Sequence, residues 1–269
     1  MAWMFAVLLF LFVLYLFLIA PGKKGKDFSA LRGFLYAHRG LFDNRNGVPE
    51  NSMAAFQRAV EAGFGMELDV QLTKGGQLVV FHDKTLSRMC GADVCLSNLS
   101  YEETQRYALL GTNERIPLFS QVLELVHGRV PLIVEIKHYS SVDRVAQAAY
   151  ALLSRYNGPY CVESFHPLAV RWFKKNAPQV IRGQLASGVT SRESPRYQQA
   201  FLKYLLVNAL SRPDFIAYDI REDRNASILL LRHMFTPLWV AWTVRTAREH
   251  EKALQTYDLQ IFEGFMPNH

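Results

Sequence analysis

The sequence predicts a TIM (β/α)8 barrel, because eight short runs rich in β-branched and aromatic residues alternate with longer helical patterns. The predicted strands are residues 34–38, 65–71, 131–136, 160–165, 180–185, 215–220, 238–243 and 259–265. The helical patterns cover residues 52–62, 142–156, 167–176, 196–209, 226–234 and 246–256. A doubly wound sheet is the alternative fold, but the chain contains neither GxGxxG after a strand nor the GxxxxGKS/T phosphate loop. We therefore expect one barrel domain over residues 34–269.

The first element is an apolar segment, residues 1–21, which we interpret as a transmembrane anchor. Residues 3–20 carry no charge, and roughly 18 helical residues rising about 1.5 Å each come close to the ~30 Å hydrocarbon thickness of a bilayer. A secretory signal peptide is the main alternative, but no Lys or Arg precedes the apolar run, and Pro21 directly after Ala20 is an awkward cleavage point. A buried core helix would be expected to show some polar positions.

The next element, residues 22–33, is a predicted basic juxtamembrane linker. Its basic residues are Lys23, Lys24, Lys26 and Arg32, against the single acid Asp27. No basic residue lies on the other flank of the apolar run, so the positive-inside rule predicts a single-pass protein with the domain that follows the anchor in the cytoplasm. The chain has a net charge of +6 but no zinc-finger spacing or basic helix with interleaved aromatics. We therefore expect contact with anionic lipid headgroups and no binding of nucleic acid.

The stretch after the second predicted strand is too long for a simple strand-helix-strand connection. Residues 73–76 have the composition of a turn between two strand-like runs, 66–72 and 78–81, which predicts a hairpin that extends this strand. Residues 84–115 are interpreted as a small insertion at the rim of the barrel mouth.

Acidic side chains occupy the predicted second and third barrel strands near their carboxyl ends, where barrel enzymes place their active sites. Glu67 and Asp69 are two residues apart, so both side chains point to the same side of an extended strand, opposite the apolar alternation. Two buried acids need a cationic partner. A divalent metal is the economical answer, with Glu135 as a third ligand, and an all-oxygen set favours Mg²⁺ or Ca²⁺ over zinc.

Two histidines and two cations complete this inventory. His38 and His82 end strand-like runs at the same predicted face, where one can accept a proton from a nucleophile while the other protonates a leaving alkoxide. Arg39 and Lys137 can neutralise the oxygens of a phosphate ester.

The loop after the first strand carries Glu50, Asn51 and Ser52. Glu50 is assigned as a fourth metal ligand, with orientation of Arg39 as its other possible role. Asn51 and Ser52 precede a helical pattern and are interpreted as helix-capping scaffold.

At these positions the chain resembles the glycerophosphodiester phosphodiesterase family. The matching motifs are Tyr36-Ala37-His38-Arg39-Gly40, Pro49-Glu50-Asn51-Ser52, Gly65-Met66-Glu67-Leu68-Asp69, Val80-Phe81-His82-Asp83 and Val134-Glu135-Ile136-Lys137. The resemblance implies a TIM barrel with an insertion after strand two. It also implies hydrolysis of glycerophosphodiesters to sn-glycerol 3-phosphate and an alcohol, through a cyclic phosphate formed by the glycerol 2-hydroxyl.

The resemblance also implies a role for each matching residue. The residues that match His38 and His82 are the acid/base pair. Those that match Glu67, Asp69 and Glu135 bind a divalent cation, with Glu50 close by. Those that match Arg39 and Lys137 contact phosphate.

The chain departs from the family pattern near its C-terminal end. Arg245 stands where many members have Asn, and residues 262–267 lack the Thr-Asp that many members carry before a similarly placed proline. Both departures lie at the rim and bear on the choice of substrate. Trp242 is assigned to substrate binding, by stacking on glycerol or a headgroup, with burial in the core as the alternative.

Alternative activities remain open from the sequence. A lysophospholipase D or a phospholipase C-like cyclising enzyme would use the anchor to reach lipid substrates. A non-catalytic binding domain is disfavoured, because a binder has no need of two proton-transfer groups. An apolar stripe of Phe201, Leu202, Leu205 and Leu206 is expected to pack against the barrel, and no pattern indicates the oligomeric state.

Overall fold

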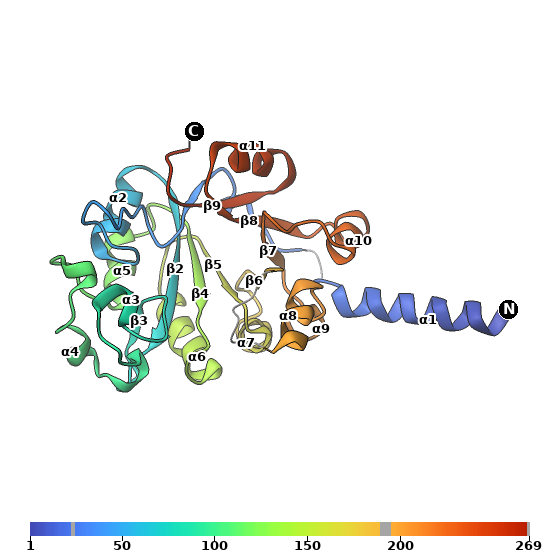
Figure 1. Cartoon of the computed structure of the whole chain (residues 1–269), viewed down its shortest axis with the longest axis horizontal. Coiled ribbons are helices and arrows are strands. Elements are labelled where there is room, and N and C mark those ends of the chain that lie inside the picture. Colours follow the sequence, from blue (N-terminus) through green and yellow to red (C-terminus); the bar gives the residue numbers. More distant parts are fainter. Residues whose placement is uncertain (23–24, 189–194, 268–269) are drawn as a thin grey trace.

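Short β-rich runs form the strands of a closed barrel in the computed structural model, which describes residues 1–22, 25–188 and 195–267. The barrel strands are β1 (Tyr36–Ala37), β2 (Gly65–Leu72), β4 (Leu132–Ile136), β5 (Tyr160–Ser164), β6 (Arg182–Ala186), β7 (Phe215–Asp219), β8 (Leu238–Val244) and β9 (Leu259–Phe262). They are parallel in the order β1-β9-β8-β7-β6-β5-β4-β2, and β1 also pairs with β2, which closes the sheet (Figure 1). The predicted barrel is confirmed, and the doubly wound alternative is excluded.

Helices cover the outer face of this barrel. They are α2 (Met53–Glu61), α5 (Phe119–Val126), α6 (Val142–Leu153), α7 (Pro167–Asn176), α8 (Arg196–Lys203), α9 (Asn208–Ser211), α10 (Ala226–Met234) and α11 (Ala247–Thr256). Helix α5, which packs against α2, was not among the predicted helices. The helix predicted over 196–209 is interrupted, because Leu205 takes a left-handed conformation at φ 57° that buries its side chain completely.

The segment after β2 forms the predicted hairpin and a small lobe. Strand β3 (Leu78–Val80) pairs antiparallel with β2. It is followed by α3 (Ser87–Cys90), η2 (Leu96–Asn98), α4 (Tyr101–Thr104) and η3 (Leu109–Gly111). These short helices enclose a core of their own that includes Phe81, Leu86 and Met89. The lobe therefore gives residues 82–88 a rigid position beside the barrel mouth.

The barrel interior divides into an apolar floor and a polar mouth. Tyr36 is completely buried in the floor and donates a hydrogen bond of 2.6 Å to the carbonyl oxygen of Leu31. Leu31 ends the short helix η1 (Ser29–Leu31), and its buried side chain belongs to the same apolar cluster as Tyr36. Gly65 faces the Tyr36 ring, and a Cβ at this position would lie 2.8 Å from it. One step further along the strands, the inward-facing positions become polar.

Helix α1 (Ala2–Ile19) is long and apolar enough to cross a membrane, a criterion of length and composition that a signal sequence near the N-terminus also meets. It projects away from the barrel beside α8, α9 and α10 (Figure 1). After Pro21 the chain returns to the barrel, where the ammonium group of Lys26 donates to the carbonyl oxygens of Pro178 and Val180. The predicted basic residues Lys23 and Lys24 lie outside the described residues.

Candidate active site

Four carboxylates form a buried layer above the apolar floor. The strand registers align Asp69 with Glu135 and Glu135 with Glu163, and Glu67 precedes Asp69 by two positions on the same side of β2. Their exposed fractions lie between 0 and 7%. One carboxylate oxygen from each of Glu67, Asp69 and Glu135 lies within 4.8 Å of the others. The three predicted metal ligands are therefore together, and Glu163 joins them as a residue that the sequence did not single out.

Two cations contact this layer from within the described part of the chain. The Lys137 ammonium lies 2.8 Å from Asp69 Oδ1 and 2.8 Å from Glu135 Oε2, and only 3% of Lys137 is exposed. The Arg39 guanidinium lies 3.4 Å from Asp69 Oδ2, while the Arg39 backbone N–H donates to Glu67 Oε2 at 3.2 Å. Full ionisation of the four acids would leave more negative charge than these two cations compensate.

The electrostatics of the layer follow from this imbalance. Burial, followed by the charges of neighbouring acids, raises the pKa of Glu67 and Glu163 well above the usual range. Burial would also raise the pKa of Asp69, but Lys137, His82 and Arg39 together outweigh it and lower that pKa. Because clustered oxygen ligands and excess negative charge are what a hard divalent cation requires, the residues fit such a cation.

His38 follows β1 and is held from one side by a carboxylate. Its Nδ1 makes a hydrogen bond with Glu263, and Glu263 in turn accepts a bond of 2.6 Å from Arg245 Nε. Its Nε2 lies 3.7 Å from Glu67 Oε2. Burial would raise the pKa of Glu263, but His38 and Arg245 outweigh it and bring that pKa to about 2. Arg245 and Glu263, which lie in the two places where the chain departs from the family pattern, therefore form an ion pair that orients His38.

A sharp turn after His38 brings Arg39 into the mouth. Arg39 adopts φ 54° and Gly40 φ 78°, and a Cβ on Gly40 would lie 2.9 Å from the backbone of Ala55 in α2. Only glycine is compatible with that close approach. The turn therefore depends on the third residue of the His-Arg-Gly motif.

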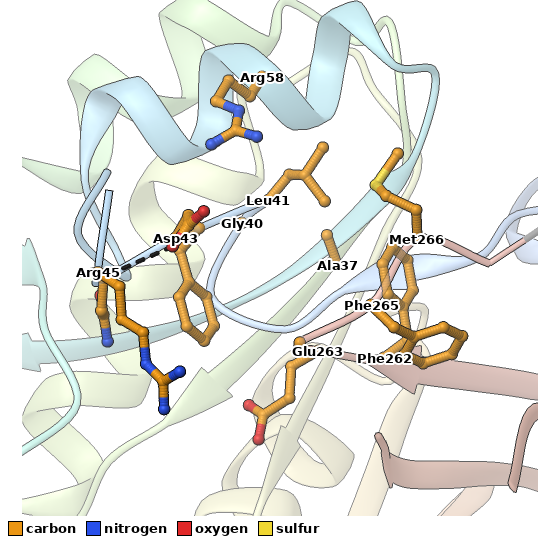
Figure 2. Close-up of a pocket in the computed structure, with 13 residues that line it drawn as sticks. Ala37, Gly40, Leu41, Asp43, Arg45, Arg58, Phe262, Glu263, Phe265 and Met266 are labelled. Atoms are coloured by element: carbon orange, nitrogen blue, oxygen red, sulfur yellow. Dashed lines mark hydrogen bonds between the residues drawn. The ribbon is translucent and has the colours of Figure 1, made fainter. Parts of the chain in front are cut away.

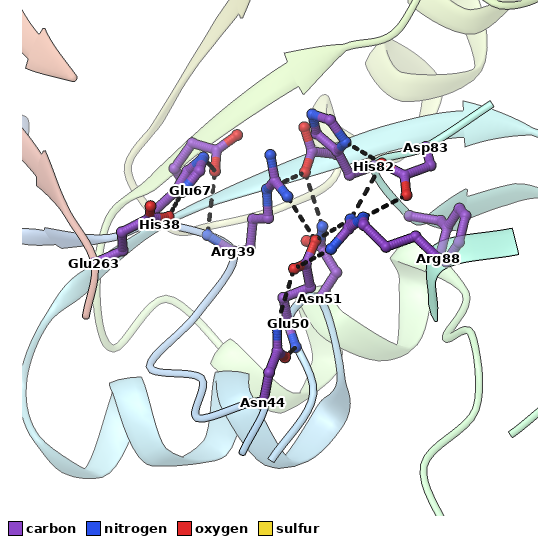
Figure 3. A network of polar contacts seen from close by, with 12 residues as sticks. His38, Arg39, Asn44, Glu50, Asn51, Glu67, His82, Asp83, Arg88 and Glu263 are labelled. Atoms are coloured by element: carbon purple, nitrogen blue, oxygen red, sulfur yellow. Dashed lines mark hydrogen bonds and ion pairs between the residues drawn. The ribbon is translucent and has the colours of Figure 1, made fainter. Parts of the chain in front are cut away.

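His82 is held in a similar way on the other side of the layer. Its Nδ1 lies 2.6 Å from Asp83 Oδ1, and Asp83 accepts a hydrogen bond of 2.7 Å from Arg88 Nε. In each histidine, Nδ1 is bound to a carboxylate, which leaves Nε2 as the nitrogen able to exchange a proton with a substrate. Figure 3 shows His38 and His82 on opposite sides of Arg39.

Glu50 lies in an arginine clamp next to this layer. Arg88 donates two hydrogen bonds to it, of 2.7 and 2.8 Å, and Arg39 donates a third of 2.5 Å (Figure 3). Burial would raise the pKa of Glu50, but Arg88 and Arg39 outweigh it and bring that pKa to about 2. Glu50 is absent from the group of carboxylates that could share a metal. Of the two roles open from the sequence, the geometry therefore favours orientation of Arg39 over a fourth metal ligand.

Asn51 and Ser52 have separate roles. The Ser52 side chain accepts the hydrogen bond of the Ala55 backbone N–H and caps α2, as predicted. Asn51 is buried at φ 55° and donates a hydrogen bond of 2.8 Å from Nδ2 to Asp69 Oδ2. Asn51 is therefore part of the site as well as of the scaffold.

Trp242 lies in the wall of the barrel at the end of β8. It is partly exposed and packs edge to face on Phe165, with ring centroids 5.4 Å apart. The packing on Phe165 agrees with the core alternative, while the partial exposure leaves part of the residue accessible.

A pocket of about 650 Å³ lies beside the mouth, between the β1-α2 loop and the C-terminal segment (Figure 2). Ala37 and Phe262 line it, and they point away from the barrel interior because His38 and Glu263, their chain neighbours, point inward. Glu263 is also at its edge. The pocket is therefore adjacent to His38 but lies outside the acidic layer.

Two histidines, a buried acidic layer and two cations at one barrel mouth define a barrel hydrolase of the phosphodiesterase class. The model of the glycerophosphoryl diester phosphodiesterase family matches residues 38–257. The chain therefore belongs to this family and is a phosphoric diester hydrolase.

Individual relatives agree with this assignment. The chain is 35% identical over 167 residues to a glycerophosphodiester phosphodiesterase of Caldanaerobacter subterraneus subsp. tengcongensis, a match that covers 58% of this chain and 67% of the relative. It is 37% identical over 121 residues to human lysophospholipase D GDPD1, which covers 40% of this chain and 38% of that protein.

Solved structures support the fold. An Oleispira antarctica phosphodiesterase in complex with the product sn-glycerol-3-phosphate matches with a TM-score of 0.70 at 21% identity, over 86% of this chain and 93% of that one. A Parabacteroides distasonis glycerophosphodiester phosphodiesterase matches with a TM-score of 0.69 at 22% identity, over 89% and 94% of the two chains.

Proposed function

We propose that this chain is a membrane-anchored glycerophosphodiester phosphodiesterase that depends on a divalent cation, Mg²⁺ or Ca²⁺, and releases sn-glycerol 3-phosphate and an alcohol. One observation carries the proposal: two histidines with carboxylate-bound Nδ1 atoms flank a buried acidic layer that contains two cations. Hydrolysis of a phosphate diester needs two proton transfers and compensation of charge on phosphate, and this site offers groups for both.

His38 and His82 are the proposed acid/base pair. Removing a proton from the attacking hydroxyl and supplying one to the departing alkoxide are separate tasks, so two imidazoles on opposite sides of the phosphate suit them. Glu263 and Asp83 fix the ring orientation of the two histidines by binding Nδ1 of His38 and of His82, respectively.

Glu67, Asp69 and Glu135 are the proposed metal ligands. The bound cation would neutralise developing negative charge on the phosphate oxygens. Lys137 and Arg39 add fixed positive charge at the same layer, and Arg39 is held in place by Glu50. Trp242 would contact the glycerol or headgroup part of the substrate.

The proposed reaction has two stages. The glycerol 2-hydroxyl attacks phosphorus, the alcohol leaves, and water then opens the resulting cyclic phosphate. A diester that lacks the 2-hydroxyl should therefore not be cleaved, although it should still compete with the natural substrate for binding.

Lysophospholipase D action is the second candidate, supported by the similarity to human lysophospholipase D GDPD1. A lysophospholipid is also a glycerophosphodiester, and its acyl chain would have to remain in a micelle or bilayer while the phosphate reaches the mouth. The two activities can be separated by comparing glycerophosphocholine with lysophosphatidylcholine.

Helix α1 is the proposed anchor, and the basic residues that follow it favour a cytoplasmic catalytic domain. In intact cells, added protease should spare the domain. Digestion without permeabilisation would contradict the proposed side of the membrane.

The activity is tested on the full chain in detergent micelles. Glycerophosphocholine, glycerophosphoglycerol and lysophosphatidylcholine are supplied with Mg²⁺, with Ca²⁺ or with a chelator, while released glycerol 3-phosphate and alcohol are measured. We expect His38→Ala and Glu67→Gln each to lower turnover by orders of magnitude. His250→Ala is the matched control, because His250 makes its hydrogen bond to Gln260 and is assigned no role in the reaction. A lack of turnover of every diester with both metals would contradict the proposal.

A further inference from the structure

Helix α1 is joined to the barrel by a tight set of contacts at its last turn. Asn208 donates a hydrogen bond of 2.7 Å to the carbonyl oxygen of Ile19. Arg212 donates to the carbonyl oxygens of Phe17 and Ala20, at 2.7 and 2.8 Å, and its guanidinium lies 4.4 Å from the centre of the Phe17 ring. These bonds occupy carbonyl groups that a helix end leaves without partners. The last turn of α1 is therefore bonded directly to α9 and to the residue that follows it, Arg212.

Two further contacts fix the direction of the helix. Tyr15 and Ser227 share a hydrogen bond of 2.6 Å between their hydroxyl groups, and Ser227 donates to the carbonyl oxygen of Tyr204 at 2.6 Å. Ile19 is completely buried in a cluster with side chains of β7 and α10. Helix α1 is thus held from two sides, by α9 and by α10.

This joint leaves too little free helix to cross a bilayer unaided. Residues 2–14 are exposed, whereas Tyr15 and Leu16 already pack against the barrel. Thirteen residues at about 1.5 Å each extend about 20 Å, compared with a hydrocarbon core of ~30 Å. If α1 crosses the core, residues 15–20 must also lie within it or at its edge. The parts of α9 and α10 that pack beside these residues then lie at the same depth.

The surface around the joint is suited to that depth. Beyond α1, from residue 20 onward, the described residues include ten large hydrophobic side chains that are exposed, and six of them lie on or next to α8, α9 and α10. They are Tyr197, Phe201, Tyr204, Leu210, Leu229 and Met234. Tyr197, Phe201 and Tyr204 are spaced as one stripe of a helix, and Phe201 is 49% exposed. The expectation that Phe201 packs against the barrel is therefore wrong, although Leu205 in the same predicted stripe is buried.

We propose that these six side chains form a seating face, with which the catalytic barrel sits in the surface of a phospholipid bilayer around the base of α1. The proposal rests on the anchoring role proposed for α1 above. The occupant is a bilayer because α9 and α10, which carry Leu210, Leu229 and Met234, pack against a helix whose own exposed residues are all apolar. Figure 1 shows α1 leaving the barrel beside these two helices. Tyrosine and phenylalanine are also suited to the boundary between hydrocarbon and headgroups.

The test places a fluorescent label at chosen positions of the full chain and measures whether each position lies within the bilayer. Cys90 and Cys95, which are partly exposed, are first replaced by serine. Single labels of bimane are then introduced by Phe201→Cys and Leu210→Cys on the seating face. Leu14→Cys reports on the anchor, and Leu254→Cys, on the exposed side of α11, is the matched control. Each protein is placed in vesicles of phosphatidylethanolamine and phosphatidylglycerol with or without brominated acyl chains.

We expect brominated lipid to remove most of the fluorescence at positions 201, 210 and 14 and to leave position 254 unchanged. Quenching at position 14 with none at 201 and 210 would show an anchored barrel that stands clear of the bilayer, and would overturn the seating face alone. A lack of quenching at position 14 would overturn the anchor and the seating face together. Cross-linking of two copies through Phe201→Cys without quenching by lipid would assign this face to a second copy and also overturn the proposal.

Discussion

Lys137 is the internal counter-ion of the proposed metal site, so Lys137→Met should change both stability and the response to metal. The ammonium group bridges Asp69 and Glu135 at 2.8 Å each, and it is 3% exposed. Methionine has a similar length but no charge. The variant therefore leaves two buried carboxylates without their nearest cation.

The size of the effect can be worked from this geometry. Removing one partner of a buried ion pair costs about 3 to 5 kcal/mol, because the remaining charge stays buried without compensation. At about 2 to 4 °C per kcal/mol for a chain of this size, the melting temperature without metal should fall by roughly 10 °C. In the variant, a bound divalent cation would replace the missing positive charge, and it would not be repelled by an ammonium group beside it. Metal should therefore raise the melting temperature of the variant more than that of the wild type.

The assay is thermal unfolding of the full chain in detergent, with a chelator, with Mg²⁺ and with Ca²⁺. Lys252→Met is the matched control, because Lys252 pairs with the buried Asp223 at 2.9 Å away from the mouth. It should lower stability without changing the response to metal. An equal response to metal in wild type, Lys137→Met and Lys252→Met would refute the assignment of Asp69 and Glu135 as ligands that Lys137 shares with a cation.

Three further predictions concern residues around this layer. Glu263→Gln should lower turnover by about 100-fold, since it removes the carboxylate that orients His38. Arg245→Gln removes only the ion-pair partner of Glu263 and should lower turnover less. Equal activities of the two variants in a steady-state assay would contradict this order. The pKa of Glu50 lies at about 2 in the folded chain, below its ordinary value of 4.5, so its stabilising contribution is complete above pH 4.5 and is lost as the pH falls toward 2. The difference in unfolding free energy between wild type and Glu50→Gln should therefore be full at neutral pH and close in that window, and a constant difference in denaturant titrations would count against the arginine clamp. Asn51→Gly should cost about 1 kcal/mol for the lost hydrogen bond to Asp69, and Asn51→Ala about 1 kcal/mol more because of φ 55°; if alanine is tolerated better than glycine in denaturant unfolding, the backbone argument fails.

Strand alternation made the barrel and the acidic layer predictable. Because side chains at i and i+2 share a face, Glu67 and Asp69 could be assigned to the interior before any contact was known. The same rule applies to Glu163, which precedes the end of β5 just as Glu135 precedes the end of β4. Glu163 is not followed two residues later by a lysine as Glu135 is, so the local sequence around it does not mark it as a site residue.

Other features depend on contacts between distant residues and could not be derived from local patterns. Arg88 and Glu50 are 38 positions apart, and nothing local indicates that one clamps the other. The link from Arg245 through Glu263 to His38 joins positions that appeared only as separate departures from a family pattern. The break between α8 and α9 falls at Leu205, where no Gly or Pro marks a turn. The left-handed conformation of Leu205 is associated with complete burial of its side chain, and the local sequence does not indicate that burial.

The joint between α1 and the barrel has a consequence for how the enzyme searches for substrate. A domain on a flexible tether samples many heights and directions above a membrane, whereas a domain clamped by Asn208 and Arg212 keeps one height and one orientation. With α1 inserted, all copies in one leaflet would present the barrel mouth at the same angle. Their search for substrate would then be lateral diffusion in two dimensions, and the rate of encounter would depend on the surface density of the enzyme.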